Sequence, residues 1–309
     1  MHYPLGRGLW FAAACAGVWS VLFTAGFAPG EMVVADFTDG NGTAAVDAYV
    51  GIPGDGWKTA WGANQLLTAG DTLTATNWVT AANPVAGGGN YLSSSVFTSV
   101  TAGASASYAT LRNYTDGIDL ALPYRIDFTI RIDEDIAATF DEYHDRYVIC
   151  DGASTAAGTG TSNSWSILAH GAAGSAAHAG VVGKWAFYNG RNNGNYYGTN
   201  PENLLDTGVA LTMGGVYDFS VTVDPIARKW SGTVSDGITS FSQSEMGWRT
   251  SASLGFANLV FGTRADVGDE TRAWSIDSIS ITQIPEPSTM TLLILAAVVW
   301  AACVRERRR

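Results

Sequence analysis

Strict alternation of apolar and polar side chains over residues 124–132 is the feature that most constrains the fold of this chain. Every second position is apolar, and the positions between hold arginine, aspartate or threonine. Because successive side chains of a β-strand point to opposite faces, the pattern predicts an antiparallel strand with one buried face. Residues 216–224 repeat it, and a turn and a second run over 229–237 follow, which predicts a hairpin.

Further strand-like runs occur along the chain, and no amphipathic helix is recognised between the two termini. These runs cover residues 31–37, 91–97, 146–150, 164–170, 184–189, 257–263 and 273–282. The connections are rich in Gly, Asn, Thr and Ser, and 47% of all residues are hydrophobic, which is enough for a sizeable core. We therefore predict an all-β domain over residues 29–283, built as a two-sheet antiparallel jelly-roll sandwich.

The net charge and the cysteine content of the chain exclude a nucleic-acid partner and sites built from several cysteines. The chain carries a net charge of −11, and because its two ends contribute +3, residues 29–283 carry −14. A surface of this charge repels nucleic acid, so no nucleic-acid partner is predicted. Cys150 is the one cysteine outside the two terminal hydrophobic runs, which excludes an intradomain disulfide and a zinc site built from cysteines.

Residues 1–28 have the layout of a secretory signal peptide. Arg7 precedes an uncharged, mostly apolar stretch over residues 8–30. This order predicts export through the Sec machinery, with cleavage after Ala25, Ala28 or Ala35. An uncleaved anchor helix is the alternative, because the apolar run is longer than that of a usual signal peptide.

Residues 284–309 combine two prolines, an apolar run and a basic cluster. Pro285 and Pro287 flank Glu286, and neither proline can extend a strand because both lack an amide donor. The 17 charge-free residues 288–304 would span roughly 25 Å as a helix, so they predict a short membrane helix. A basic cluster then predicts a cytoplasmic C-terminus, with the domain on the other side of the membrane: Arg305, Arg307, Arg308 and Arg309.

This three-part order resembles the PEP-CTERM sorting signal of exported Gram-negative proteins. Ile284 stands where that family more often has Val. The resemblance implies that the protein crosses the inner membrane, is anchored transiently by its C-terminal helix, and is cut near Pro-Glu-Pro by an exosortase. It implies delivery to the cell surface or to the extracellular polysaccharide matrix. Whether the helix is removed stays open at this point.

The middle of the chain resembles the concanavalin A-like lectin and glucanase superfamily, particularly its laminin-G-like members. The resemblance implies that the first and last strands of the domain lie together, so residues 32–37 are expected beside residues 275–281. The resemblance rests on the order of the predicted strands and on the general composition of residues 36–42, 56–62, 217–224, 229–237 and 274–281.

Two activities are compatible with that superfamily, carbohydrate binding and glycan hydrolysis. Its glucanases carry closely spaced carboxylates on one strand, and this sequence has no such strand. We therefore predict a non-catalytic, carbohydrate-binding surface or matrix protein with extracellular polysaccharide as its partner. A secreted glycan hydrolase and a purely structural matrix protein are the alternatives. The acidic cluster that a hydrolase would use is expected to be a solvated connection, with a calcium site as another alternative: Asp133, Glu134, Asp135, Asp141, Glu142 and Asp145.

The strongest candidate for ligand binding is the stretch 184–203, in which aromatic residues alternate with Asn, Arg and Gly. Aromatic faces stack on sugar rings, while Asn and Arg side chains form hydrogen bonds with hydroxyl groups. The alternative is a polar hairpin loop whose tyrosines pack on the sheet. The candidate residues are Trp185, Tyr188, Arg191, Asn192, Asn195, Tyr196 and Tyr197.

Two smaller candidates lie near the start of the domain. Trp57 and Trp61 offer aromatic rings, although their pattern is more typical of core residues at the edge of a sandwich. No cofactor is predicted, but Asp36, Asp39 and Asn41 supply oxygen ligands of the kind that calcium prefers. A turn formed by Asp-Gly and Asn-Gly pairs is the alternative interpretation of that segment.

Overall fold

The computed structural model describes thirteen separate stretches of the chain, and nearly all of their regular structure is β. The two predicted terminal helices lie outside these stretches. Within them, no helix is long and apolar enough to cross a membrane. The described residues are 32–37, 44–45, 56–67, 70–81, 84–85, 89–101, 106–134, 146–152, 163–170, 183–190, 203–250, 255–265 and 268–285.

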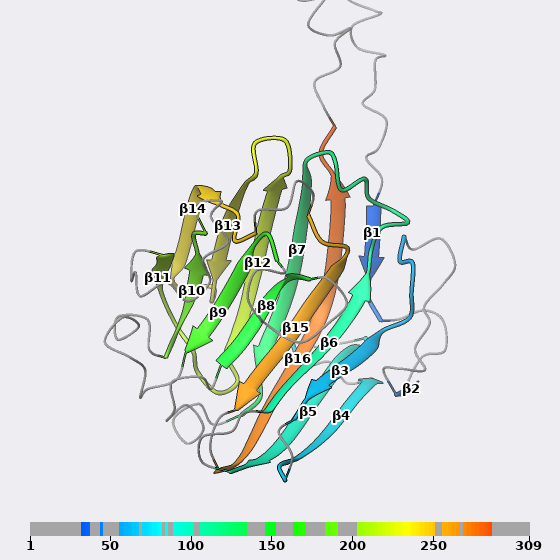
Figure 1. Cartoon of the computed structure of the whole chain (residues 1–309), viewed down its shortest axis with the longest axis vertical. Coiled ribbons are helices and arrows are strands. Elements are labelled where there is room, and N and C mark those ends of the chain that lie inside the picture. The colour runs from blue at the N-terminus through cyan, green and yellow to red at the C-terminus, as the bar shows by residue number, and fades with distance from the viewer. Residues whose placement is uncertain are drawn as a thin grey trace, which may run out of the picture. The chain divides into compact units, whose positions relative to one another are not determined.

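Within the described stretches, the larger sheet contains nine antiparallel strands, and its long last strand β16 (Gly268–Gln283) lies near the middle (Figure 1). Strand β1 (Met32–Ala35) pairs with the end of β16, with Val33 opposite Ile281, so the predicted pairing of first and last strands is confirmed. From one edge to the other, the remaining order is β14 (Ser240–Gly247), β13 (Lys229–Ser235), β12 (Val216–Asp224), β7 (Tyr124–Ile132), β16, β5 (Tyr91–Val100), β4 (Thr72–Thr80) and β2 (Ala44–Ala45).

The smaller sheet has seven strands among the residues that the structure describes, all paired antiparallel, and it covers one face of the larger sheet (Figure 1). The predicted all-β sandwich with two antiparallel sheets is therefore confirmed, and its arrangement is consistent with a jelly roll. The order of the smaller sheet is β11 (Leu204–Ala210), β10 (Lys184–Tyr188), β9 (Ser166–His170), β8 (Arg146–Gly152), β15 (Asn258–Ala265), β6 (Ala106–Asn113) and β3 (Gly62–Leu66).

The core lies between the sheets and is rich in aromatic side chains. Phe128 of β7 stacks on Phe219 of β12 with a centroid distance of 5.0 Å. The ring of Phe128 also meets Phe261 of the facing sheet edge-on at 5.5 Å. These contacts follow from the alternation in β7 and β12, because every second side chain of both strands faces the other sheet.

The two outer faces of the sandwich differ in character. Strands β8 and β9 bury side chains on both faces, and a second apolar cluster that includes Val148, Cys150 and Leu168 lies on the outer face of the smaller sheet. The outer face of the larger sheet is instead lined by serine and threonine from β4, β5, β12, β13 and β14. The candidate site lies on this polar face.

Candidate functional site

The predicted binding residue Trp185 does not face solvent. Its side chain is fully buried between the sheets and meets the rings of Tyr217 and Phe219 edge-on, at 5.5 and 5.0 Å. The prediction for Trp185 is therefore wrong, because the alternation of β10 directs this residue into the core.

Tyr188 is also covered, although it lies on the opposite side of β10. Only 2% of the residue is exposed, and the guanidinium of Arg249 lies 4.7 Å from the centre of its ring. The ring face that a sugar would use is taken by Arg249, so the prediction for Tyr188 is wrong as well. The other candidates of this stretch lie outside the described residues and stay predictions: Arg191, Asn192, Asn195, Tyr196 and Tyr197.

The segment considered for calcium is only partly described. Asp36 is exposed directly after β1, whereas Asp39 and Asn41 lie outside the described residues. Among the residues that are described, no group of three or more His, Cys, Asp or Glu side chains lies close enough to hold a metal ion. The calcium proposal for these three residues therefore stays a prediction.

Trp57 and Trp61, the aromatic candidates near the start of the domain, belong to the core, as their sequence pattern indicated. Trp57 is 8% exposed and Trp61 is 2% exposed. The indole N–H of Trp57 donates to the carbonyl of Val34 at 2.7 Å, and the guanidinium of Arg112 lies 4.7 Å from the Trp57 ring. These contacts fix the segment before β3 against β1 and β6.

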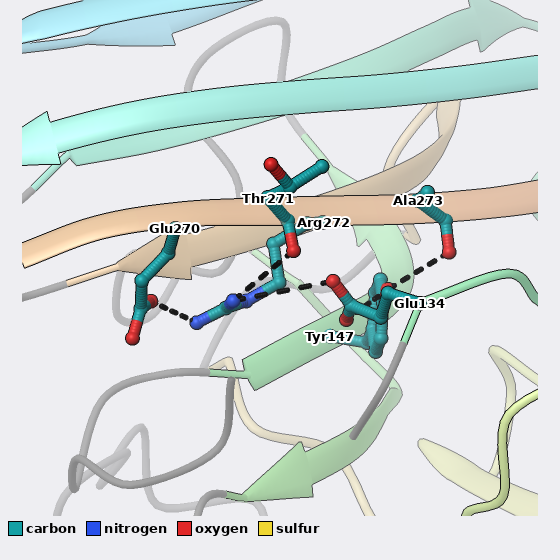
Figure 2. Close-up of polar contacts among 6 residues, drawn as sticks. All are labelled: Glu134, Tyr147, Glu270, Thr271, Arg272 and Ala273. Carbon is teal, nitrogen blue, oxygen red and sulfur yellow. Dashed lines mark hydrogen bonds and ion pairs between the residues drawn. The ribbon is translucent and has the colours of Figure 1, made fainter. Parts of the chain in front are cut away.

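Two residues of the acidic cluster are described, and one of them corrects the expectation of a solvated connection. Asp133 forms an ion pair with Arg131 at 2.9 Å. Glu134 is buried in the interior at 6% exposure. Figure 2 shows it between the hydroxyl of Tyr147, which donates to its carboxyl, and the guanidinium of Arg272. Asp135, Asp141, Glu142 and Asp145 lie outside the described residues.

Burial dominates the protonation of Glu134. Removal from water raises the pKa of its carboxyl from 4.5 to about 8, against the opposing effects of Arg272 and of the hydrogen bond from Tyr147. Arg272 is fully buried and pairs with Glu270 of the same strand, so the cation is neutralised without Glu134 (Figure 2). This cluster is enclosed between the sheets and is an internal polar network.

A second buried carboxyl, Asp151, was not recognised from the sequence. It accepts hydrogen bonds from the amides of Ser164 (2.6 Å), Trp165 (3.3 Å) and Phe256 (3.1 Å), and from the hydroxyl of Ser164. Burial raises its pKa from 3.8 to about 6, and these hydrogen bonds limit the shift. Asp151 thus ties the end of β8 to two connecting segments.

A shallow hollow lies on the outer face of the larger sheet, with a volume of about 290 Å³. Four neighbouring strands line it with outward side chains, among which hydroxyl groups predominate. The hydroxyl of Thr129 donates to Asp218 at 2.7 Å, and Arg125 pairs with Asp127 at 2.8 Å. The lining polar residues are Arg125, Asp127, Thr129, Asp218, Ser220, Thr233, Ser235, Ser278 and Ser280.

The hollow continues over the hairpin β12–β13 into a second depression of about 210 Å³. This one is lined by serine, threonine, glycine and glutamine, with the hydroxyls of Thr233 and Ser242 at 2.9 Å. Together they present fixed hydrogen-bond donors and acceptors on a rigid sheet, which suits a ligand rich in hydroxyl groups. Sequence reasoning missed this site because it used the alternation of β7 and β12 only to find inward residues.

The comparisons with known proteins bear first on the C-terminal segment. Residues 283–309 match the family model described as the PEP-CTERM protein-sorting motif. The chain carries a PEP-CTERM sorting motif. The motif implies export, membrane-anchored sorting in a Gram-negative bacterium, and processing by an exosortase. A comparison with curated proteins finds no match.

Several solved structures are similar to the sandwich at low sequence identity. A sialidase shares 9% identity at a TM-score of 0.42 over 71% of this chain, which spans only 17% of the sialidase. An endo-β-1,4-glucuronan lyase from the fungus Trichoderma reesei shares 13% identity at a TM-score of 0.41, over 78% of this chain and 94% of the lyase. Basic winged bean lectin, solved with Tn-antigen, shares 7% identity at a TM-score of 0.42, over 82% of this chain and all of the lectin.

Proposed function

We propose that this exported protein is a non-catalytic component of the cell surface or extracellular matrix that binds polysaccharide on the outer face of its larger sheet. The observation that carries the proposal is the hollow of about 290 Å³ lined by outward hydroxyl, carboxylate and guanidinium groups. Export by the PEP-CTERM route brings this face into contact with extracellular polysaccharide, which is the partner expected from the sequence.

The chemistry of the hollow matches the hydroxyl groups of sugars. Carboxylates of Asp127 and Asp218 accept hydrogen bonds, Arg125 donates them, and serine or threonine hydroxyls do both. All these side chains stand on strands held by neighbours on both sides, so little ordering is needed when a ligand binds.

The absence of catalysis is proposed from the state of the carboxyl groups. Hydrolysis of a glycosidic bond uses one protonated and one ionised carboxyl on either side of the sugar. Glu134 has the raised pKa that suits a general acid, but it is buried between the sheets and does not line the hollow. Asp127 and Asp218 already form contacts with Arg125 and Thr129.

Affinity electrophoresis of the full chain through gels containing soluble polysaccharides tests the proposal. We expect retardation that falls at least severalfold in Asp218→Asn and is unchanged in Asp206→Asn, which removes the same charge from β11 of the other sheet. Lack of retardation by every polysaccharide would contradict the binding function. Release of reducing sugars that Asp218→Asn abolishes would establish a glycan-cleaving enzyme instead.

A further inference from the structure

A row of aromatic side chains crosses the part of the larger sheet that the hollow does not occupy. Strands β4 and β5 pair antiparallel, from Thr72 opposite Ser99 to Thr80 opposite Tyr91. Their inward positions include Val79, Leu92 and Val96 of the core. The alternate positions therefore point outward, and three of these are aromatic: Trp78 of β4, and Tyr91 and Phe97 of β5.

Two of these aromatic residues have a large solvent-exposed fraction for their size. Trp78 is 46% exposed and Phe97 is 41% exposed, and Tyr91 is partly exposed. Large aromatic residues normally contribute to the core of a sandwich, so rings that a regular strand holds out toward solvent indicate contact with a partner.

The register places the three rings along one line. Phe97 lies opposite Thr74, and Trp78 lies opposite Ser93, so Phe97 and Trp78 are four residues apart along the paired strands. At about 3.3 Å per residue this is a separation of about 13 Å, and Tyr91 lies about 7 Å further in the same direction. The row of rings is thus about 20 Å long and follows the strands.

The outward positions of β4 and β5 around the row are polar and carry no charge. The seven other outward positions of β4 and β5 are four threonines and three serines. On the other side of Phe97, strand β16 presents Thr271 as its paired residue, and the exposed Asp269 lies two residues further, opposite Ser99. An ionic partner therefore finds no complementary charge along these two strands, unlike in the hollow with Arg125, Asp127 and Asp218.

We propose that Tyr91, Trp78 and Phe97 form a binding strip for an extended, uncharged polysaccharide chain. The flat rings stack on the apolar faces of sugar rings, and the hydroxyls of the flanking Ser and Thr residues form hydrogen bonds with the sugar hydroxyls. A second copy of this chain fits less well, because protein interfaces are depleted in serine. The proposal rests on the proposed function for polysaccharide as the partner, but it uses a different surface and a different chemistry.

Pull-down of the full chain, kept in mild detergent, on microcrystalline cellulose tests the strip. Cellulose is the probe because its chains are extended and uncharged. We expect binding that persists at 1 M NaCl, since salt screens charges and leaves stacking unaffected. Trp78→Ala and Phe97→Ala should each weaken binding about tenfold, while Trp78→Phe, which keeps a ring, should weaken it less. Ile238→Ala serves as the matched control, because Ile238 is 96% exposed in the turn between β13 and β14.

The results separate this inference from the proposed function. Retention of wild-type affinity by Trp78→Ala and Phe97→Ala would overturn the strip, and polysaccharide binding that only Asp218→Asn weakens would leave the proposed function intact. Self-association that disappears in Trp78→Ala while cellulose binding stays unchanged would show that a second copy occupies the strip. Both side chains are nearly half exposed, so the thermal unfolding midpoints of the variants should lie within a few degrees of the wild type.

Discussion

The hydroxyl of Tyr147 on β8 donates a hydrogen bond to the carboxyl of Glu134, which follows β7 in the facing sheet (Figure 2). The same hydroxyl lies 3.1 Å from the carbonyl of Ala273 on β16. A protonated Glu134 can itself donate to Tyr147, which leaves the tyrosine proton for Ala273. The contact therefore joins three strands through a carboxyl group that burial keeps neutral.

This burial makes stability depend on pH. The pKa of Glu134 is about 8 in the folded protein and 4.5 for an exposed glutamate. Between these values the folded state holds a proton that the unfolded state has lost, so the free energy of unfolding falls as pH rises from about 4.5 through 8, by about 1.4 kcal/mol per pH unit at most. Asp151 adds a slope of the same sign between 3.8 and about 6.

Urea denaturation at pH 5 and pH 8 measures the effect of Glu134. Glu134→Gln keeps a neutral side chain of the same shape at both pH values, so its midpoint should fall less between them than that of the wild type. Glu245→Gln on the exposed face of β14 is the matched control and should follow the wild type. Equal pH dependence of Glu134→Gln and the wild type would show that Glu134 is ionised in the fold.

Asp151 should be the most sensitive carboxylate for stability among those described here. Asp151→Ala leaves the buried amides of Ser164, Trp165 and Phe256 without their acceptor, at an expected cost of about 3 kcal/mol. Asp151→Asn keeps one acceptor oxygen and should cost less. Urea midpoints at pH 7 measure both, and a change below about 1 kcal/mol in Asp151→Ala would show that water replaces the carboxylate.

The sequence predicted those parts of the fold that depend on local alternation. Strands β7 and β12 bury every second residue, so their positions and their inward faces were visible in the sequence. The pairing of β1 with β16 followed from the resemblance, and it is confirmed. Strand β10 buries four consecutive residues, so its sequence does not distinguish a core tryptophan from a ligand-binding one.

The buried carboxyls and the aromatic strip depend on contacts between distant segments. Glu134 becomes buried only because Tyr147, Arg272 and Glu270 surround it, and two of these lie more than a hundred residues away in the sequence. Likewise, the row of Trp78 and Phe97 forms only in the register that pairs β4 with β5. A sequence pattern gives the face on which a side chain lies but not its neighbours on that face.

Arg125 allows ligand binding to be changed with little effect on stability. Its ion pair with Asp127 is solvent-exposed, with 53% and 39% of the two side chains accessible, so Arg125→Ala should alter the free energy of unfolding by less than about 1 kcal/mol. Its loss should nevertheless weaken polysaccharide retardation in affinity gels, because a charged donor leaves the hollow. A thermal shift of many degrees, or unchanged retardation, would contradict this assignment.

The end of β16 shows where sorting can remove the C-terminal segment without disturbing the sandwich. The amide of Ile284 donates to the carbonyl of Pro123 at 2.8 Å, and Gln283 holds the same carbonyl with its side chain. Pro285 is exposed and has no amide to donate, so cleavage beyond it breaks none of these bonds. We expect intact-mass analysis of protein from the native cell surface to show a chain that lacks residues 290–309. Replacement of Pro285, Glu286 and Pro287 by alanine should retain the tail, and a wild-type mass that includes residues 290–309 would contradict processing.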